Sequence, residues 1–208
     1  MSGDVTARRP NVLLVLTDQQ RWDHVGFNGN PDVATPVLDG LAATGRVLSR
    51  THVASPTCAP NRASLLTSRS PSAHGLRVNG LALDPDTQTV ASVFRAAGYR
   101  TGLVGKSHLQ PYGIKVDRPG QSQPDNARTV ADSSWENRAR HDAEYVRMPE
   151  DYYGFSHVEL TIGHGSDVSG HYAHWLRDRG VEPDQIRGRE QSRRHTSWKE
   201  QQAKAKRS

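Results

Sequence analysis

The run Asn11-Val12-Leu13-Leu14-Val15-Leu16-Thr17 decides the fold class of this chain. It is continuously apolar and rich in branched side chains, which is typical of a strand buried on both faces of a parallel sheet. The run stops abruptly at the polar residues Asp18-Gln19-Gln20. Because ligands in open α/β sheets collect beyond the carboxyl ends of strands, we expect Asp18 and Gln19 to lie at a ligand site.

Helices and strands alternate after this run. Thr35 and Pro36 have the chemistry of a helix start, with Thr35 as N-cap, and Gly45 is a suitable helix end. The hydrophobic pattern then predicts, in order, a strand, two helices and a strand over residues 47–53, 60–67, 89–97 and 99–104. This order indicates an α/β domain.

The remainder of the chain is less regular. Residues 110–150 are polar without a hydrophobic period, so we interpret them as a long insertion. A strand over 155–162 and a short helix over 168–179 are expected to follow. The resulting division is a flexible N-terminus over 1–9, a domain over 10–180, and a basic, disordered tail over 181–208.

Composition narrows the class of protein. The 208 residues include 34% hydrophobic residues and carry a net charge of +5. Residues 186–208 contain eight basic and two acidic side chains, a net charge of +6, so the rest of the chain carries −1. Such a tail could contact RNA or anionic surfaces, but a solvated end is the preferred interpretation, and no specific nucleic-acid partner is predicted. No stretch approaches the roughly 20 apolar residues that cross a bilayer, so we expect a soluble, cytoplasmic protein without a membrane contact.

The chain has a single cysteine, Cys58, which excludes an intramolecular disulfide and a Cys2His2 zinc site. This cysteine opens the sequence Cys58-Ala59-Pro60-Asn61-Arg62, a C-x-P-x-R pattern. The pattern and the run that follows it to Gly75 are similar to the signature of type I sulfatases, in which the cysteine is oxidised to formylglycine. The commonest family form has Ser where Asn61 stands and Gly where Ser68 stands.

Three further matches occur in the family's order: Asp18-Gln19 after the first strand, Thr35-Pro36 at the first helix, and Gly105-Lys106-Ser107-His108 after a later strand. The chain therefore resembles the N-terminal part of a bacterial sulfatase, and residues 10–180 would be the N-terminal part of the sulfatase domain. The resemblance implies an α/β fold of the alkaline-phosphatase-like superfamily, with a mixed, mostly parallel sheet flanked by helices, here truncated.

The resemblance also implies a sulfuric ester hydrolase that uses a formylglycine derived from Cys58. Sulfate monoesters carry negative oxygens that repel nucleophiles, so the site needs a cation, positive side chains and an unusual nucleophile. The hydrated aldehyde would offer one hydroxyl to attack sulfur and a second whose deprotonation expels sulfate, whereas an unmodified thiol could be sulfated only once. The implied partners are a small-molecule sulfate ester and a formylglycine-generating or anaerobic sulfatase-maturating enzyme.

A divalent metal ion is part of the same expectation. The resemblance implies Ca²⁺, with Mg²⁺ or Mn²⁺ as alternatives. The implied ligands are Asp18, the side-chain carbonyl of Gln19 and an oxygen of the modified Cys58, in line with the preference of hard cations for oxygen.

Four more residues receive roles from the resemblance. Arg62 lies one helical turn after Cys58 and would hold the formylglycine hydroxyl and the metal carboxylates. Lys106 would stabilise the sulfate oxygens and His108 would orient the nucleophile. Because these two residues alternate, an extended backbone would point both to one side. Asn79 would contact the leaving group, as in phosphonate hydrolases, or would be only a turn residue.

Three histidines, His164, His171 and His174, lie near Asp167 and could suggest a separate metal site. Two of them are one helical turn apart, and we prefer a histidine-rich wall near the pocket, or a surface helix, over a metal site.

Two alternatives stay open. Phosphonate monoester and phosphodiester hydrolases share the C-x-P-x-R pattern, but tend to have neutral groups at the places of Lys106 and His108. The other alternative is an inactive truncated remnant, because the sequence after Gly180 holds no second metal-ligand pair of the family's type.

Overall fold

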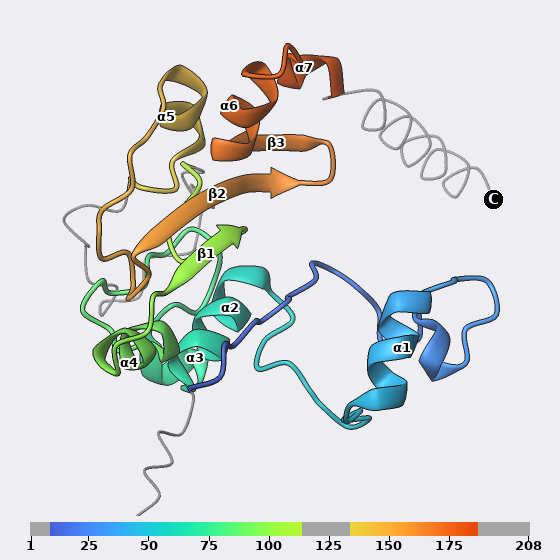
Figure 1. Ribbon diagram of the computed structural model, residues 1–208. Coiled ribbons are helices and arrows are strands. Elements are labelled where there is room, and N and C mark those ends of the chain that lie inside the picture. Colours follow the sequence, from blue (N-terminus) through green and yellow to red (C-terminus); the bar gives the residue numbers. More distant parts are fainter. Residues whose placement is uncertain (1–8, 114–133, 187–208) are drawn as a thin grey trace, which may run out of the picture. The chain divides into compact units, whose positions relative to one another are not determined.

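The computed structural model of the protein describes residues 9–113 and 134–186 (Figure 1). Nearly all of the predicted N-terminus and tail, and the middle of the predicted insertion, fall outside these ranges. The chain divides into two units, Met1–His52 and Val53–Ser208, and each is described by itself. None of the described helices is long and apolar enough to cross a membrane.

The first unit contains the short 3-10 helix η1 (Gly26–Asn28) and helix α1 (Pro36–Thr44). The predicted N-cap Thr35 and the predicted helix end at Gly45 are confirmed. The hydroxyl of Thr35 does not cap α1, since it accepts the Gly26 N–H at 2.7 Å and donates to Asp39 at 2.9 Å. Side-chain hydrogen bonds therefore connect η1 to α1.

Neither strand predicted for the first unit is formed. Residues 11–17 and 47–53 are both described and neither is paired as a strand. The side chains of Val12 to Leu16 have exposed fractions between 44% and 87%. A fully buried strand requires neighbours that bond its backbone and cover both its faces. The described part of the first unit contains no strand to supply them, so the prediction is wrong for both segments.

The second unit is built on a three-stranded mixed sheet of order β1-β2-β3, with strands β1 (Gly102–Gly105), β2 (His157–His164) and β3 (Asp167–Gly170). Strands β1 and β2 are parallel, whereas β2 and β3 are antiparallel. The strands predicted over 99–104 and 155–162 are thus confirmed with shifted ends. Strand β3 takes the first residues of the helix predicted over 168–179.

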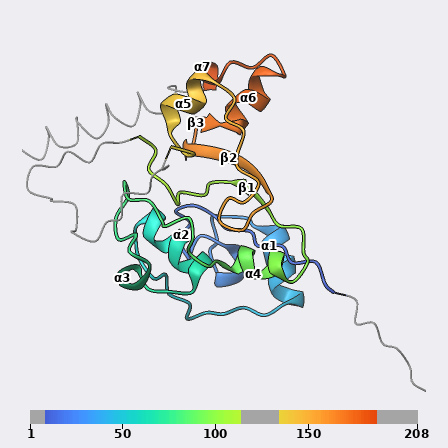
Figure 2. The same ribbon diagram turned by 90° about the vertical axis from the view of Figure 1, so that its left-hand side faces the viewer.

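Helices flank this sheet. Helices α2 (Cys58–Thr67), α3 (Pro71–His74) and α4 (Val90–Ala96) lie on the β1 side of the sheet, whereas α5 (Arg138–Ala143), α6 (His171–Arg177) and α7 (Pro183–Ile186) contact β3 (Figures 1 and 2). Helix α2, strand β2 and the loops between the elements supply the hydrophobic core, which consists of Ala59, Ala63, Leu66, Leu76, Leu83, Leu109, Tyr152, Tyr153, Val158, Leu160 and Ile162. The α/β class expected from the sequence is confirmed.

Two segments that looked irregular in sequence contribute to this packing. Residues 134–149, from the predicted insertion, place Glu136, His141 and Val146 in the interior with exposed fractions of 0–1%. Helix α7, with the buried Pro183, lies inside the stretch 181–208 that was assigned to the tail. Residues 183–186 of the predicted tail thus form a short helix.

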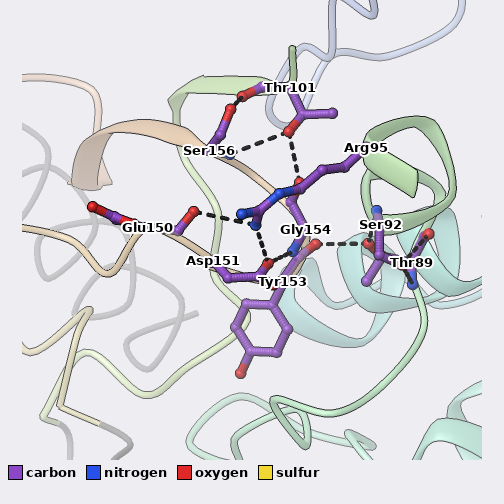
Figure 3. A network of polar contacts seen from close by, with 9 residues as sticks. All are labelled: Thr89, Ser92, Arg95, Thr101, Glu150, Asp151, Tyr153, Gly154 and Ser156. Carbon is purple, nitrogen blue, oxygen red and sulfur yellow. Dashed lines mark hydrogen bonds and ion pairs between the residues drawn. The ribbon is translucent and has the colours of Figure 1, made fainter. Parts of the chain in front are cut away.

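A polar network joins α4 to the turn that leads into β2 (Figure 3). Thr89 and Ser92 form a capping box at the start of α4. The hydroxyl of Thr89 also donates to the carbonyl of Tyr153 at 2.7 Å, and Arg95 pairs with Asp151 at 2.8 Å. These contacts hold the turn against the helix.

Gly154 lies in this turn at φ 88°, where a Cβ would come within 2.2 Å of the Ser92 backbone nitrogen. We expect Gly154→Ala to lower the free energy of unfolding by about 2–5 kcal/mol, combining left-handed backbone strain with overpacking against a helix backbone. Urea denaturation measures the change. Gly180→Ala is the matched control, because Gly180 has φ 73° and no atom within 4 Å of an added Cβ. Equal losses in the two variants would show that the contact with α4 has no effect.

Candidate active site

Cys58 is the first residue of α2 and is half-buried. The side-chain amide of Asn79 donates to its sulfur at 3.2 Å. The amide oxygen of Asn79 accepts the backbone N–H of Ala59 at 3.1 Å, in place of Thr57, whose side chain makes no capping bond. The structure therefore brings the two predicted residues Cys58 and Asn79 together, and Asn79 also caps the helix that carries the cysteine.

Arg62 connects this helix to the segment that follows β1. Its guanidinium lies one turn after Cys58 and donates to the backbone carbonyl of Lys106 at 2.6 Å. Helix α2 and the Gly105–His108 segment are thus held together by a predicted site residue.

Lys106 has an immediate partner that the sequence did not reveal. Its ammonium nitrogen lies 2.6 Å from Nε2 of His164. Because β1 and β2 are parallel, the residues at their carboxyl ends meet at the same edge of the sheet. An ammonium can only donate, so His164 accepts at Nε2 and carries its proton on Nδ1.

The other two histidines near Asp167, His171 and His174, contact backbone groups. His171 accepts the Leu160 N–H at Nδ1 and lies 2.8 Å from the Val146 carbonyl at Nε2. His174 lies 2.9 Å from the carbonyl of His141. Within the described ranges, no group of three or more His, Cys, Asp and Glu side chains could hold a metal ion.

His108 is buried, and its ring stacks on Tyr112 with the centroids 4.1 Å apart. Its backbone is left-handed, at φ 58°. The assumption of an extended backbone between Lys106 and His108 is therefore wrong. The two side chains have different surroundings, since Lys106 reaches the exposed His164 while His108 lies in the interior.

The segment after β1 is held by a residue that sequence reasoning missed. Glu136 is completely buried and accepts the backbone N–H groups of His108, Leu109 and Gln110. Burial raises the pKa of this carboxyl, and the hydrogen bonds it accepts, the strongest from the hydroxyl of Tyr152, oppose that rise. A single glutamate in a polar stretch carries no pattern that would have indicated this role.

His74, from the signature run, has a structural role. Its Nε2 lies 2.9 Å from the Ser64 hydroxyl, and its Nδ1 accepts the Leu76 N–H at 3.2 Å. Burial lowers the pKa of His74. The imidazole therefore acts as a neutral link between α2 and the loop after α3.

Asp18 and Gln19 belong to the first unit, and both are exposed. Gln19 has a left-handed backbone, at φ 56°, as His108 has. Non-glycine residues in this conformation cost free energy and cluster at functional sites. The donors that these two residues offer, a carboxylate and an amide carbonyl, are oxygen ligands that suit Ca²⁺ or Mg²⁺.

Known proteins resemble this chain over part of its length. The sulfatase family model matches residues 10–148. An ulvan-active sulfatase of Formosa agariphila is 41% identical over 101 residues, which are 49% of this chain and 20% of that protein. An arylsulfatase of Clostridium perfringens is 41% identical over 106 residues, 50% of this chain and 22% of that protein. This chain thus matches about one fifth of the length of these curated relatives.

A solved structure shares the fold over most of the chain. The phosphonate monoester hydrolase of Agrobacterium radiobacter superposes with a TM-score of 0.57 at 29% identity, over 87% of this chain and 30% of that chain. The expected alkaline-phosphatase-like α/β fold, with a mixed sheet flanked by helices, is confirmed for the part that this chain holds. Because the family model spans more than half of the residues, the chain belongs to the sulfatase family.

Proposed function

We propose that this chain carries the nucleophile and the sulfate-binding lysine of a sulfuric ester hydrolase, with Cys58 converted to formylglycine. The observation that supports this most is the direct connection between two motifs, in which Arg62 of the Cys58 helix bonds the backbone of Lys106. A nucleophile and a cation on joined elements are what an anionic ester requires, because the cation offsets the charge that repels the nucleophile.

Residue 58 has surroundings that suit the modification. Formylglycine would supply a hydrated aldehyde, whose hydroxyl is a nucleophile at neutral pH and whose second hydroxyl allows sulfate to leave. The amide of Asn79 donates to the sulfur position, and it would donate equally to an oxygen placed there. Asn79 would thereby fix the orientation of the reacting group.

The residues after β1 would bind the ester. Lys106 would hold the sulfate oxygens by charge, and the neutral His164 would keep the ammonium at the carboxyl end of β1. His108 is proposed as the group that orients the nucleophile, acting from the interior of the same segment.

Asp18 and Gln19 are the proposed ligands of Ca²⁺, or of Mg²⁺ or Mn²⁺, and such a metal would supply positive charge that offsets the charge of an anionic ester. Support comes from the order of the motifs and the oxygen donors. The proposal includes a small-molecule sulfate ester as substrate, a formylglycine-generating or anaerobic sulfatase-maturating enzyme as partner, and the cytoplasm as location.

Phosphonate monoester hydrolysis is the second candidate. The superposition with the Agrobacterium radiobacter enzyme and the contact of Asn79 with Cys58 favour it. The cationic Lys106 and the basic His108 favour the sulfatase. An inactive remnant is the third outcome, because the relatives are about five times longer than the matched region.

The test is an assay of the full chain coexpressed with a formylglycine-generating enzyme, with 4-nitrophenyl sulfate and 4-nitrophenyl phenylphosphonate as substrates. Mass spectrometry of the Cys58 peptide reports conversion, and chelation with EDTA followed by added Ca²⁺ or Mg²⁺ reports metal dependence. Faster, metal-dependent sulfate release supports the sulfatase, and faster phosphonate cleavage supports the second candidate. Converted Cys58 without turnover of either ester means that this chain is inactive by itself.

A further inference from the structure

One buried carboxylate organises the segment after β1. Oε2 of Glu136 accepts the N–H of His108 at 2.7 Å, and Oε1 accepts those of Leu109 and Gln110 at 2.8 and 3.0 Å. The hydroxyl of Tyr152 adds a bond of 2.5 Å to Oε1. All four of these bonds run from an N–H or O–H donor to a Glu136 oxygen, which is the arrangement that suits an ionised glutamate.

Backbone geometry explains why an acceptor is needed. A left-handed residue at His108 turns consecutive N–H groups toward one side, which makes a concave site for an anion. Buried N–H groups without an acceptor would each cost free energy comparable to a lost hydrogen bond. Glu136, 28 residues from His108, satisfies three of them at once.

Residues 110–112 in turn accept hydrogen bonds from the residues on either side of Glu136. The side-chain carbonyl of Gln110 accepts the N–H of Trp135 at 3.0 Å, and the carbonyl of Tyr112 accepts the N–H of Arg138 at 3.3 Å. Backbone bonds on both sides of Glu136 therefore keep it in register with the segment after β1.

We propose that Glu136 is a positioning residue: its buried carboxylate holds the backbone of residues 108–110 and so fixes Lys106 and His108 at the carboxyl end of β1. The role of Lys106 and His108 in binding the ester rests on the proposed function. The bonds between Glu136 and residues 108–110 do not depend on it. Glu136 belongs to the stretch 110–150 that was predicted as a polar insertion, and it would fix the backbone of the ester-binding segment without contacting the ester itself.

The test uses Glu136→Gln in the full chain, with amide hydrogen exchange and ¹H–¹⁵N NMR as readouts. An amide oxygen is a weaker acceptor than a carboxylate, and the glutamine NH₂ would oppose N–H donors. We expect exchange at residues 108–110 to become roughly ten- to a hundredfold faster than at the amides of β2, the range for lost bonds to a charged group. Equal acceleration in both places would mean a general loss of stability and would overturn the positioning role.

Tyr152→Phe provides a second variant that keeps the carboxylate. Tyr152 shares Oε1 with Leu109 and Gln110, while His108 bonds Oε2. Removing the hydroxyl leaves more acceptor strength for Oε1, so the amide protons of Leu109 and Gln110 are expected to move downfield while that of His108 stays. A role in stability alone predicts no such asymmetry, and unchanged shifts at all three amides would overturn the proposal.

The wild-type chain gives a check that needs no variant. Amides of residues 108–110 should exchange as slowly as those of β2, and exchange at the rate of exposed loops would contradict the arrangement. None of these measurements requires turnover. Absence of ester hydrolysis in the wild type would therefore count against the proposed function, and the exchange and shift data would still decide the role of Glu136.

Discussion

Cys58→Ala is expected to abolish hydrolysis of 4-nitrophenyl sulfate by the matured chain. Alanine offers no atom for conversion to formylglycine and no nucleophile, and removing the nucleophile of an enzyme that uses covalent catalysis costs on the order of 10⁶-fold in kcat. The rate of 4-nitrophenol release, measured beside the wild type from the same maturation strain, gives the result. Turnover retained above about one hundredth of the wild-type rate would mean that another group attacks the ester.

We expect Cys58→Ala to keep the fold, so that a loss of activity relative to the wild type reports the loss of the nucleophile. Asn79 accepts the N–H of Ala59 whatever side chain stands at position 58, so the cap of α2 remains. We expect the free energy of unfolding to change by less than about 1.5 kcal/mol, the typical net value of one hydrogen bond. Circular dichroism and urea denaturation provide this control.

Cys58→Ser separates attack from release. Serine has one hydroxyl, so it can take up sulfate once, with loss of the 4-nitrophenol leaving group, but it lacks the second hydroxyl through which sulfate would leave. The expected result is at most one equivalent of 4-nitrophenol per chain, and a mass increase of one SO₃ unit on the peptide that contains the serine. Sustained turnover by the serine variant would contradict a requirement for the modified residue.

Local signals made the starts of two helices predictable, whereas α3, α5 and α7 were not predicted. Helix α1 begins at Pro36, as the pair Thr35-Pro36 indicated, and α4 begins at Val90, within the range predicted from the hydrophobic pattern. Glycine endings act at the same short range, as Gly45 shows. Such signals depend on a few neighbouring residues and need no information about the rest of the fold.

Strands depend on partners far along the chain, and here the sequence was a poorer guide. Residues 11–17 have the composition of a buried strand and are exposed, while residues 168–170, which were predicted to begin a helix, pair with β2 as part of β3. An apolar composition shows that a segment is suited to burial as a strand. The strand forms only where a neighbouring segment offers N–H and C=O groups for its backbone to bond. The hydrophobic pattern therefore indicates a potential strand and leaves its formation undecided.

In the candidate site, too, the sequence indicates local features better than contacts between residues far apart in the chain. The resemblance selected Cys58 and Asn79, and spacing placed Arg62 one helical turn after the cysteine. The partners His164 and Glu136 lie 58 and 28 residues from the groups they contact, so their positions depend on strand register and on burial of a polar segment. A family motif selects the reacting residues, and only the fold reveals what holds them.

Lys106→Met is expected to lower kcat/KM for 4-nitrophenyl sulfate by about 10²–10³-fold. Methionine keeps the length and the packing of the side chain while it removes the charge, and deleting one preorganised stabilising group at a developing oxyanion costs this much. Initial rates over a range of substrate concentrations give kcat and KM separately. Stability should be little changed, because Lys106 is only half-buried and the bond from Arg62 goes to its backbone carbonyl.

His164→Gln tests whether the histidine acts through Lys106. The loss of one hydrogen bond to a charged group predicts about a tenfold decrease in kcat/KM for this variant alone. In the double variant, the methionine has no ammonium to hold, so the second substitution should add almost nothing to the loss caused by Lys106→Met. The loss of kcat/KM in the double variant is then smaller than the product of the two single losses by nearly the whole effect of His164→Gln. Such coupling is expected of residues in contact. If the two losses instead multiply, His164 contacts the ester independently of Lys106, and the carboxyl ends of β1 and β2 provide two separate sulfate-binding groups.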